Sequence, residues 1–388
     1  MLIAGGGVGG LAAAIALGRR GIETEVLERS RFTEETGAGI QLGPNATREL
    51  AALGVLDVIE PHAFRPEAIS IYDGISGRRL SSVPLGKHAE QRYGAPYLTL
   101  HRADLHAGLR TVAQSLSQVE LRPGFDVTAI DAQGGAVVAR AVDGSEAEGT
   151  SLIGADGLWS IVRPLIMPAA SLRFTGATAW RALLSRGSLF SPFDAPVIGL
   201  RLGPGTHLVH YPVRGGGDLN IVAVTEGGAE RQGWNQSGNA EALLSSFAHW
   251  TKDSKSLLEL AEGWRSWSLS RLTHLSRWSA GPIALLGDAA HPVLPYLAQG
   301  AALAIEDAVS LAACVGASPG DPAAAFRRYE ALRRPRASRV QRLSRRFGWL
   351  YHVSGPMRLA RNLVLARRSE QTALRRFDWL YRDEDERG

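Results

Sequence analysis

The chain opens on a glycine-rich turn between a short apolar strand and a helix. The turn has the spacing Gly-x-Gly-x-x-Gly; it follows Leu2-Ile3-Ala4 and precedes an alanine- and leucine-rich stretch from Leu11 to Arg20. In this arrangement the first glycine permits the tight turn, the second lets the backbone approach a pyrophosphate, and the third lets helix and strand pack closely. The helix N-terminus attracts the phosphate charge. We therefore predict a dinucleotide-binding turn formed by Gly5, Gly7, Val8, Gly9 and Gly10.

A second strand returns beside the first and ends on an acidic residue. Gly21 ends the helix, and a strand from Thr24 to Glu28 follows. Glu28 then lies where a carboxylate accepts hydrogen bonds from a ribose diol, and we include its neighbour Arg29 in the predicted cofactor site. Only three or four residues precede the glycines, so either the first strand is short or Met1 is not the natural start.

Two later segments point to the same bound nucleotide. The buried strand Ser151-Leu152-Ile153-Gly154-Ala155-Asp156 leads into Gly157, and the strand Ile283-Ala284-Leu285-Leu286 leads into Gly287-Asp288. We expect the chain to return to the nucleotide at both places. A buried aspartate also occurs as a helix cap or turn former, and this alternative stays open for Asp156 and Asp288.

Together these motifs resemble the flavin-dependent aromatic hydroxylases in which one domain handles both FAD and NAD(P)H. The resemblance is strongest to the salicylate hydroxylase and 3-hydroxybenzoate 6-hydroxylase branch, with the p-hydroxybenzoate hydroxylase fold, and it covers nearly the whole chain. Further stretches that agree are Gly37-Ala38-Gly39-Ile40-Gln41-Leu42, Pro44-Asn45-Ala46, His101-Arg102-Ala103-Asp104-Leu105, Trp180-Arg181, Tyr296-Leu297-Ala298-Gln299-Gly300, Ile305-Glu306-Asp307-Ala308 and Phe377-Asp378-Trp379-Leu380-Tyr381.

The resemblance implies a role for individual residues around FAD. Asp288 would hold the ribityl chain, and Arg102 would contact the cofactor near its phosphates. The backbone of Gly300 and Ala301 would face the flavin ring at a helix N-terminus, whose dipole would stabilise negative charge on the reduced flavin. The same resemblance places Asp156 and Val127 in the cofactor site.

The fold class that follows is α/β: a Rossmann-like FAD-binding domain with an inserted antiparallel-sheet substrate domain and C-terminal helices. Alternating strands and glycine-rich turns run from Phe174 to about Leu275, a hairpin is predicted around Gly134-Gly135, and the chain is helical after Pro322. The predicted boundaries are 1–72, 98–172 and 280–340 for the FAD-binding domain, 73–97 and 173–279 for the substrate domain, and 341–388 for the C-terminal helical segment.

One strand of the substrate domain carries the candidate catalytic residues. Alternation along His207-Leu208-Val209-His210-Tyr211 puts His207 and Tyr211 on one face and His210 on the other. In 3-hydroxybenzoate-like relatives a His and a Tyr four residues apart line the substrate pocket. A histidine, with a reference pKa of about 6.5, could take the proton of a phenol with a pKa of about 10. A solvated sheet histidine is the alternative.

Other candidates carry less weight. His291 has no companion ligand at metal-binding spacing, so we predict no metal site. Pro295 stands where some relatives carry a substrate-contacting glutamine, which argues against a specific 3-hydroxybenzoate assignment. The arginines that could bind an anionic substrate group are Arg181, Arg201 and Arg214, and we interpret the arginines from Arg327 to Arg376 as solvated helix faces.

Composition limits the partners and the compartment. The net charge is +5, and Lys87, Lys252 and Lys255 are the only lysines among 43 basic residues. No nucleic-acid-binding motif accompanies this charge, and attraction of an anionic cofactor and substrate explains its sign. A single cysteine, Cys314, excludes an internal disulfide and favours a cytoplasmic location. The N-terminal apolar run is too short to span a membrane.

We therefore expect an FAD-dependent, NAD(P)H-consuming monooxygenase that hydroxylates a small aromatic, such as salicylate or hydroxybenzoate. The resemblance implies a flavin C4a-hydroperoxide, attacked by the ring of the deprotonated phenol. A flavin oxidase, reductase or halogenase on the same scaffold and a non-catalytic FAD-binding protein are the alternatives. The sequence leaves open the ring substrate, NADH against NADPH, decarboxylating against simple hydroxylation, and whether the protein is a homodimer.

Overall fold

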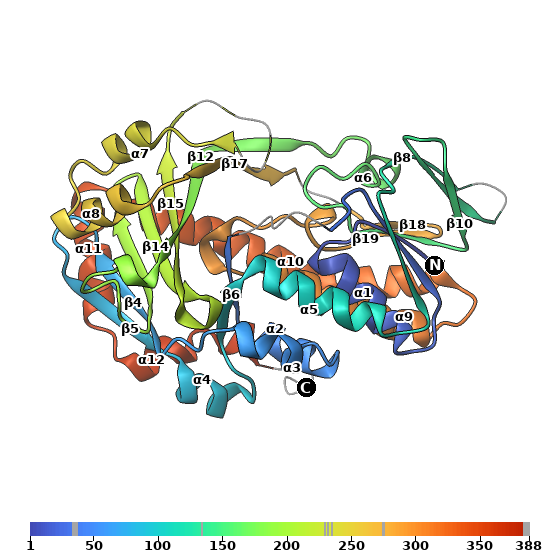
Figure 1. The fold of residues 1–388 in the computed structure, drawn as a ribbon, viewed down its shortest axis with the longest axis horizontal. Helices are drawn as coiled ribbons and strands as arrows, with labels where there is room; N and C mark the ends of the chain where they lie inside the picture. The colour runs from blue at the N-terminus through green and yellow to red at the C-terminus, as the bar shows by residue number, and fades with distance from the viewer. Residues whose placement is uncertain are drawn as a thin grey trace.

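A computed structural model describes residues 1–32, 38–132, 135–228, 230, 233, 236–273 and 276–382. The positions Gly37, Gly134 and Leu275, used in the sequence analysis, lie outside these ranges. Within them, none of the helices combines the length and the apolarity that crossing a bilayer requires. Figure 1 shows an elongated molecule with a broad sheet at one end and the N-terminal βαβ unit at the other.

A mostly parallel sheet carries the N-terminal glycine turn. Its strand order is β18-β19-β11-β1-β2-β7, and β1 (Leu2–Ala4) lies between β2 (Thr24–Glu28) and β11 (Leu152–Gly154), parallel to both. The next strand, β19 (Ile283–Leu285), is parallel to β11. The strands that precede the three motifs therefore end at one edge, as predicted, although they are far apart in sequence. The outer strands are β7 (Val119–Pro123) and β18 (Ser279–Ala280).

The helix that follows the turn is buried on nearly all sides. No residue of α1 (Val8–Gly18) is exposed. The helix packs between α5 (Arg102–Gln114) and α9 (Gly300–Gly316). A helix that is apolar all round needs such cover, since no face of it suits water. The predicted helix over Leu11 to Arg20 corresponds to α1.

Next to this sheet lies a three-stranded antiparallel one. Its strands are β8 (Val127–Asp131), β9 (Val137–Ala141) and β10 (Glu146–Gly149), in the order β10-β9-β8. The β8–β9 pair confirms the predicted hairpin.

The second large sheet has eight strands in the order β16-β17-β12-β15-β14-β13-β4-β5. It is antiparallel as predicted except at β4 and β13, which are parallel. The exception arises because the antiparallel pair β4–β5 comes from a much earlier segment, and β4 of that pair lies beside β13. The strands are β4 (Ala68–Asp73), β5 (Arg79–Pro84), β12 (Leu172–Ser185), β13 (Ile198–Gly203), β14 (Thr206–Val213), β15 (Asp218–Glu226), β16 (Gln236–Ser237) and β17 (Arg265–Leu272).

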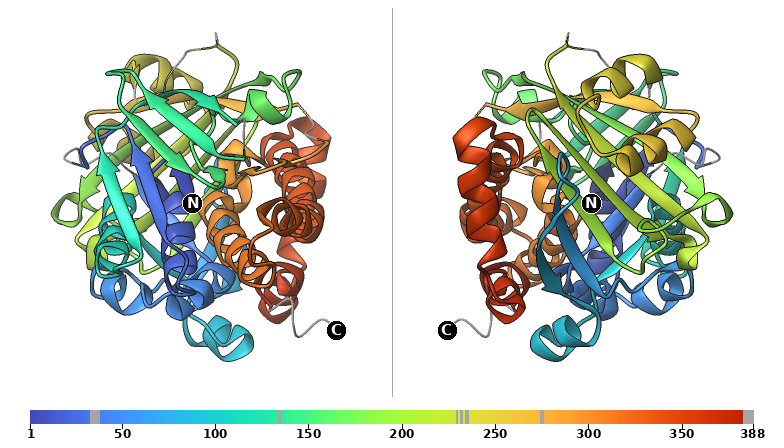
Figure 2. Two further views of the ribbon diagram at one scale, coloured as in Figure 1. Left: turned by 90° about the vertical axis from the view of Figure 1, so that its right-hand side faces the viewer. Right: turned by 90° about the vertical axis from the view of Figure 1, so that its left-hand side faces the viewer.

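The chain ends in helices that form one side of the molecule (Figure 2). These are α10 (Pro322–His352), α11 (Gly355–Ala366), α12 (Glu370–Arg375) and α13 (Asp378–Tyr381). α10 packs on α9 and also reaches β13 and β14, while α11 and α12 pack on β5. One long helix thus joins the two ends of the molecule.

Shorter elements complete the chain. A two-stranded sheet pairs β3 (Gly39–Leu42) with β6 (Leu98–His101). The remaining helices are α2 (Pro44–Ala52), α3 (Leu56–Ile59), α4 (Gly86–Tyr93), α6 (Arg163–Ile166), α7 (Ala240–Ser246) and α8 (Lys252–Leu260).

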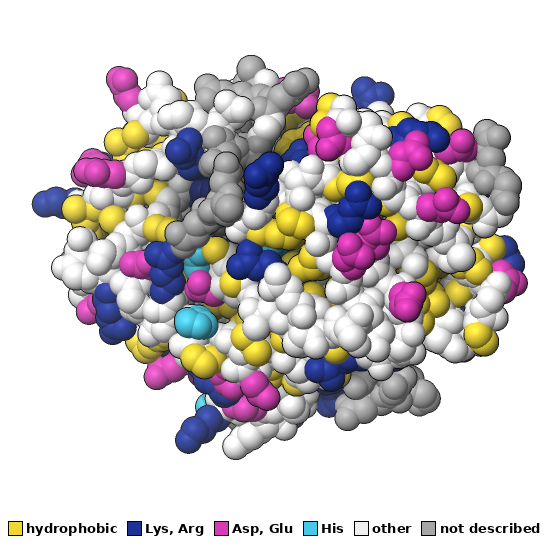
Figure 3. Space-filling model, turned by 45° about the vertical axis from the view of Figure 1, so that its right-hand side comes forward, with side chains coloured by type: hydrophobic (Ala, Val, Ile, Leu, Met, Phe, Trp, Pro, Cys, Tyr) yellow, Lys and Arg dark blue, Asp and Glu magenta, His cyan; other side chains and the backbone are white. Residues whose placement is uncertain are grey.

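The predicted α/β class, with a parallel sheet, a separate largely antiparallel sheet and C-terminal helices, is confirmed. Several predicted boundaries fall inside elements. The one after residue 72 lies within β4, the one after residue 172 within β12, and the one after residue 340 in the middle of α10. Figure 3 shows Lys and Arg side chains interspersed with Asp and Glu on one face of the molecule.

Candidate functional site

The three glycines of the N-terminal turn have three different surroundings. Gly5 has a φ of +104°, and a Cβ built on it would lie 2.5 Å from the carbonyl oxygen of Ala155. A Cβ on Gly10 would lie 1.9 Å from the carbonyl oxygen of Gly5, whereas one on Gly7 would meet nothing within 4 Å. The turn therefore needs Gly5 and Gly10 for its own conformation. Open space remains at Gly7, where a pyrophosphate would approach, so the turn fits a dinucleotide.

The start of α1 also brings the distant motifs together. Val8 and Gly9 are its first two residues. A Cβ on Gly9 would lie 2.6 Å from Cδ2 of Leu286 and 3.3 Å from Cβ of Ala304. Gly9 thus lets α1 pack against the residue that precedes Gly287-Asp288 and against α9.

Glu28 lies at the end of β2, beside the turn. Its Oε2 accepts a hydrogen bond from the Gly6 N–H at 2.7 Å, and its Oε1 accepts one from the Ser30 N–H at 2.8 Å. Each carboxylate oxygen keeps a second lone pair. The backbone therefore holds the carboxylate in place while it can still accept hydrogen bonds from a ribose diol. The neighbouring Arg29 is exposed.

Asp288 follows β19 and is half-buried. Burial raises the pKa of its carboxyl, and this outweighs the lowering by His291, Arg102 and Arg163. No side chain or backbone N–H in the described part of the chain donates a hydrogen bond to this carboxylate. A half-buried carboxylate without a donor among the described residues suits a hydroxyl-bearing ligand. Arg102, at the start of α5, is exposed and close enough to influence Asp288.

Asp156 forms hydrogen bonds within its own turn, which agrees with the turn-forming role that the sequence left open for it. Its Oδ2 accepts hydrogen bonds from the N–H groups of Ile161 at 2.8 Å and Val162 at 3.2 Å. The carboxylate therefore shapes the turn after β11, while its Oδ1 has no partner among the residues described. Val127, the other residue implied only by resemblance, begins β8 and is half-buried.

Gly300 and Ala301 form the first turn of α9. A Cβ on Gly300 would meet nothing within 4 Å, so this helix N-terminus has open space in front of it. The preceding Gln299 is buried, and its Oε1 accepts a hydrogen bond from Asn45 Nδ2 at 3.0 Å. The amide thus ties the entrance of α9 to α2.

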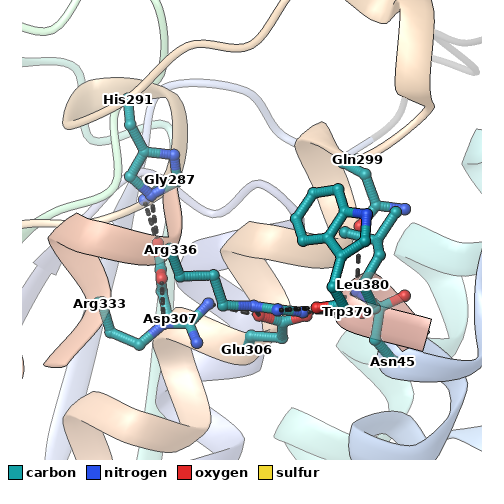
Figure 4. Close-up of polar contacts among 10 residues, drawn as sticks. All are labelled: Asn45, Gly287, His291, Gln299, Glu306, Asp307, Arg333, Arg336, Trp379 and Leu380. Carbon is teal, nitrogen blue, oxygen red and sulfur yellow. Dashed lines mark hydrogen bonds and ion pairs between the residues drawn. The ribbon is translucent and has the colours of Figure 1, made fainter. Parts of the chain in front are cut away.

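A buried ionic network fixes α9 against α10 (Figure 4). Arg333 donates from Nη2 to Glu306 at 2.5 Å and from Nε to Asp307 at 2.8 Å. Arg336 donates from Nε and Nη2 to Glu306, at 2.6 and 2.7 Å, and also from Nη2 to the carbonyl oxygen of Leu380 at 2.9 Å. Asn45 Nδ2 donates to the same glutamate at 2.5 Å.

The two arginines keep the acids of this network ionised. Burial alone would raise the pKa of Glu306, but Arg333 and Arg336 outweigh it and lower the pKa to about 2. Asp307 has a lowered pKa for the same kind of reason, since His291 and Arg333 outweigh its burial. Its Oδ2 also accepts a hydrogen bond from the Gly287 N–H at 3.4 Å. The network therefore also holds the loop that carries Asp288.

His291 takes part in this network. Its Nε2 is hydrogen-bonded to Asp307, and its ring lies 4.8 Å from that of Trp278, measured between centroids. Among the residues described, no group of three or more His, Cys, Asp or Glu side chains could hold a metal ion.

A cavity of about 660 Å³ lies between the large sheet and the C-terminal helices. Its walls come from β4, β5, β13 and β14, from residues 295–298, and from α10 to α13. Most lining side chains are aliphatic or aromatic, and His207 is the one histidine that lines it within the described chain. Pro295 lies on its wall, next to the loop that enters α9.

His207 and Tyr211 extend on the predicted side of β14 but have different surroundings. His207 packs against Tyr296 and Tyr351 and lines the cavity. Tyr211 is buried behind the lining, in contact with Gly39 and beside Gln41. His210 lies on the other face against Phe193, as the alternation predicts.

None of the three candidate arginines lines the cavity. Arg201 is buried between the rings of Tyr72 and Phe193, Arg181 lies over Trp267, and Arg214 pairs with Asp218 at the surface. The cavity is instead lined by Arg361, Arg368 and Arg376 of the C-terminal helices.

The interpretation of the C-terminal arginines as solvated is wrong for three of them. Arg333, Arg336 and Arg361 are buried. Arg333 and Arg336 are buried because acidic side chains and backbone carbonyls far away in sequence accept their hydrogen bonds. Arg361 donates to the carbonyl oxygen of Tyr351, on the preceding helix. Local spacing contains no signal for such partners. The same holds for His352, the last residue of α10, whose ring is hydrogen-bonded to His207.

Comparison with known proteins gives one consistent result. A family model described as FAD binding domain matches residues 1–344. The 3-hydroxybenzoate 6-hydroxylase of Polaromonas naphthalenivorans (strain CJ2) is 36% identical over 381 residues, which are 98% of this chain and 95% of that protein. The 3-amino-4-hydroxybenzoate 2-monooxygenase PtnB3 of Streptomyces platensis is 38% identical over 383 residues, covering 98% and 94%.

Solved structures agree with these relatives. The crystal structure of Klebsiella pneumoniae HpxO complexed with FAD and uric acid has a TM-score of 0.86 and 26% identity, over 98% of this chain and 96% of that one. A salicylate hydroxylase substrate complex has a TM-score of 0.82 and 24% identity, over 98% and 94%, and so shares the fold.

Proposed function

Because the chain belongs to the family of FAD-dependent aromatic monooxygenases, we propose that its substrate is a small phenolic acid and that His207 takes the phenolic proton. The enzyme is an FAD-dependent monooxygenase, with NAD(P)H as the source of electrons and O₂ as the oxidant. Bound FAD would supply the redox chemistry, namely hydride uptake from NAD(P)H and activation of O₂. The chain itself supplies binding, orientation, exclusion of water and control of the phenolic proton.

The observation that carries this proposal is the position of His207. It lies on the wall of the cavity, with aromatic and aliphatic neighbours, and its Nε2 makes no hydrogen bond to any residue in the described ranges. Burial lowers the pKa of His207 well below its ordinary value. The imidazole is therefore neutral, and its Nε2 offers a lone pair to the phenolic proton. Loss of that proton makes the ring of a phenol more electron-rich, which favours its hydroxylation.

The residues that would hold FAD follow from the geometry above. The turn of Gly5, Gly7 and Gly10 would bind the pyrophosphate and Glu28 the ribose. Asp288 would accept hydrogen bonds from the ribityl chain, and the open N-terminus of α9 at Gly300 and Ala301 would face the ring. Arg102 would lie near the phosphates. These assignments rest on the open space at Gly7 and Gly300 and on the free carboxylate of Asp288.

The relatives support the substrate class. Those named 3-hydroxybenzoate 6-hydroxylase and 3-amino-4-hydroxybenzoate 2-monooxygenase are 35–38% identical to this chain. All these names describe a benzoate with a ring hydroxyl. The positive charges of Arg361, Arg368 and Arg376, which line the cavity, would attract a carboxylate on the substrate.

A substrate panel tests the proposal. NADH and NADPH oxidation by the purified FAD-loaded protein is measured with salicylate, 3-hydroxybenzoate, 4-hydroxybenzoate, 3-amino-4-hydroxybenzoate and, as the control without a hydroxyl, benzoate. At least one phenolic acid should stimulate oxidation and yield a product with one new hydroxyl group, with or without loss of CO₂. Stimulation without an oxygenated product from any of them would contradict the proposal.

Two variants on one strand test His207. His207→Asn should slow hydroxylation about 10²- to 10⁴-fold, the usual contribution of general-base help, while FAD content stays the same. The matched control is His210→Asn, the same change on the opposite face of β14, which should stay within a few-fold of the parent. Equal rates in His207→Asn and the parent would exclude His207 as the base.

We further propose a homodimer in the cytoplasm. Exposed apolar side chains on α11 support self-association: Met357, Leu359, Leu363 and Val364 are 53, 62, 52 and 51% exposed. Light scattering of the purified protein should give twice the mass of 41.5 kDa. A monomer mass at micromolar concentration would contradict the dimer. The single cysteine supports the reducing compartment.

A further inference from the structure

A chain of three side chains leads from the cavity to the surface. His207 Nδ1 lies 2.8 Å from His352 Nε2, and His352 Nδ1 lies 2.7 Å from Glu226 Oε1. His207 and His352 are buried, whereas the Glu226 side chain is 54% exposed. These three residues, called the His–His–Glu chain below, join a group that faces the cavity to a carboxylate in contact with solvent.

Three elements hold the His–His–Glu chain in place. His207 is on β14, Glu226 ends the adjacent strand β15, and His352 ends α10. The carbonyl oxygen of His352 accepts a hydrogen bond from the Gly205 N–H at 3.0 Å. Arg361 donates to the carbonyl oxygen of Tyr351 at 2.8 Å. The end of α10 is therefore fixed to the strand that carries His207.

Aromatic rings enclose the buried part of the chain. The centroids of the Tyr296 and Tyr351 rings lie 5.4 Å from that of His207, and the Tyr351 hydroxyl donates to the Tyr296 carbonyl oxygen at 3.2 Å. Burial raises the pKa of Tyr296 to about 12 and also raises that of Tyr351. Both tyrosines therefore stay protonated near neutral pH, which leaves the histidines and Glu226 as the groups that exchange protons.

The carboxylate at the outer end fixes where each proton lies. An ionised carboxylate only accepts hydrogen bonds, so His352 must donate to Glu226 from Nδ1–H. Neutral His352 then has a lone pair on Nε2, and His207 must donate to it from Nδ1–H. Neutral His207 is left with its own lone pair on Nε2. The chain of hydrogen bonds thus selects the tautomer in which Nε2 of His207 can act as a base.

We propose that His352 and Glu226 are positioning residues for His207: they hold it in the tautomer that accepts the substrate's proton, and they carry that proton to solvent. The inference rests on the proposed function, in which His207 takes the phenolic proton. Neither His352 nor Glu226 lines the cavity, so both act on the substrate through His207.

Along the His–His–Glu chain, each bond to hydrogen that breaks is matched by one that forms. The phenolic O–H bond breaks as an N–H bond forms at His207 Nε2. The Nδ1–H bond of His207 breaks as one forms at His352 Nε2, which leaves His207 neutral and His352 positively charged. His352 then releases its Nδ1 proton to Glu226 or to water, and the phenolate remains in the cavity.

Charges around His352 explain why Glu226 is needed. Burial lowers the pKa of His352, and the guanidinium of Arg361 lowers it further, whereas Glu226 raises it. Without the Glu226 carboxylate, burial and the positive charge of Arg361 would both lower the pKa of His352, and protonation of His352 would be less favourable. The carboxylate therefore makes His352 a usable acceptor in an apolar surrounding.

Nitrogen NMR tests the tautomer without using activity. In FAD-loaded protein labelled with ¹⁵N-histidine, His207 should be neutral with its proton on Nδ1 near neutral pH, and His352 likewise. In Glu226→Gln, whose amide can also donate, the Nδ1–H preference of both rings should weaken. A proton on Nε2 of His207 in the parent protein would overturn the proposal, whatever the protein hydroxylates.

Proton release tests the relay itself. FAD-loaded protein without NAD(P)H is mixed with 3-hydroxybenzoate in the presence of a pH-indicator dye. Glu226→Gln should bind the ligand with an affinity close to that of the parent but release the proton about tenfold more slowly, which corresponds to about one pKa unit lost at His352. The matched control is Glu259→Gln, the same change at an exposed position of α8 that is not part of the His–His–Glu chain.

A second variant separates the two proposals. His352→Asn should slow proton release at least as much as Glu226→Gln, and should move the acid limb of the kcat/KM profile to higher pH. If His207→Asn slows hydroxylation while Glu226→Gln and His352→Asn both release the proton at the parent's rate, the relay is wrong and the proposed function stands. Because Glu226 is exposed, its variant should fold normally, so that this comparison holds even where His352→Asn is unstable.

Discussion

Gly7 and Gly10 differ in what a methyl group would meet, although both belong to one turn. A Cβ at Gly7 has open space, and one at Gly10 would lie 1.9 Å from a backbone oxygen. We expect Gly7→Ala to leave the melting temperature of the FAD-free protein unchanged within a few degrees and to weaken FAD binding at least about tenfold, since the methyl takes the space of the phosphate. Fluorescence titration with FAD measures the affinity.

Gly10→Ala should behave in the opposite way. The methyl group forces α1 away from β1, so the FAD-free protein itself should be destabilised by about 1–3 kcal/mol, the usual result of overpacking. Urea unfolding of both variants without FAD gives the comparison. A Gly7→Ala protein that binds FAD as tightly as the parent would argue against a pyrophosphate at this position.

At the scale of residues, the sequence identified groups whose signal is local. The spacing of Gly5, Gly7 and Gly10 predicted a turn, and the alternation around His207 predicted the two faces of its strand; their roles in binding and catalysis stay predictions. His352 and Arg333 carry no such signal, because their partners are 145 and 26 residues away in sequence, on other elements. Only the folded chain brings those partners within hydrogen-bonding distance.

At the scale of elements, the joint between α9 and α10 depends on buried charges. Glu306 lies between two arginines and has a pKa of about 2. Glu306→Gln leaves Arg333 and Arg336 without their main counter-charge, which should lower the free energy of unfolding by about 3–5 kcal/mol. The control is Glu90→Gln, which breaks an ion pair whose partners are 41 and 46% exposed and should cost less than about 1 kcal/mol. Urea unfolding measures both.

The same network predicts a dependence on pH. The pKa of Glu306 in the folded protein is about 2, below its ordinary value of 4.5. Its contribution to stability is therefore complete above pH 4.5 and is lost as the pH falls through about 2. The difference in unfolding free energy between the parent and Glu306→Gln should shrink from about pH 6 to about pH 3. A constant difference over this range would contradict the assignment.

The N-terminus of α10 gives a smaller test. The Asp321 carboxylate accepts a hydrogen bond from the Ala324 N–H at 2.9 Å, as an N-cap. Asp321→Ala should lower the free energy of unfolding by about 1 kcal/mol, whereas Asp321→Asn, which keeps a capping oxygen, should cost less. Equal losses in the two variants, measured by urea unfolding, would show that the cap bond is not the cause.

Most elements could be predicted because their patterns are strong. α1 and the strand pair β1–β2 follow from apolar periodicity and the glycine punctuation. The parallel pairing of β4 with β13 could not, since it joins segments more than 120 residues apart by backbone hydrogen bonds alone. Side-chain patterns tell which faces are buried but do not name the neighbouring strand.

At the scale of the whole molecule, the C-terminal helices connect the two ends of the protein. α10 carries Arg333 and Arg336 beside α9 and ends at His352 beside the cavity, which α11 and α12 help to enclose. The sequence predicted that this segment is helical. It did not predict that the segment lines the cavity, because the apolar residues that do so are the same types that would cover any core.

We propose that this enzyme uses O₂ to add one oxygen atom to a phenolic ring. The most direct measurement is turnover of FAD-loaded protein with NADH and the best substrate of the panel under ¹⁸O₂, followed by mass spectrometry of the product. We expect one ¹⁸O atom in each hydroxylated molecule. Oxygen derived from water in the product, or NADH consumption that yields only hydrogen peroxide, would contradict it.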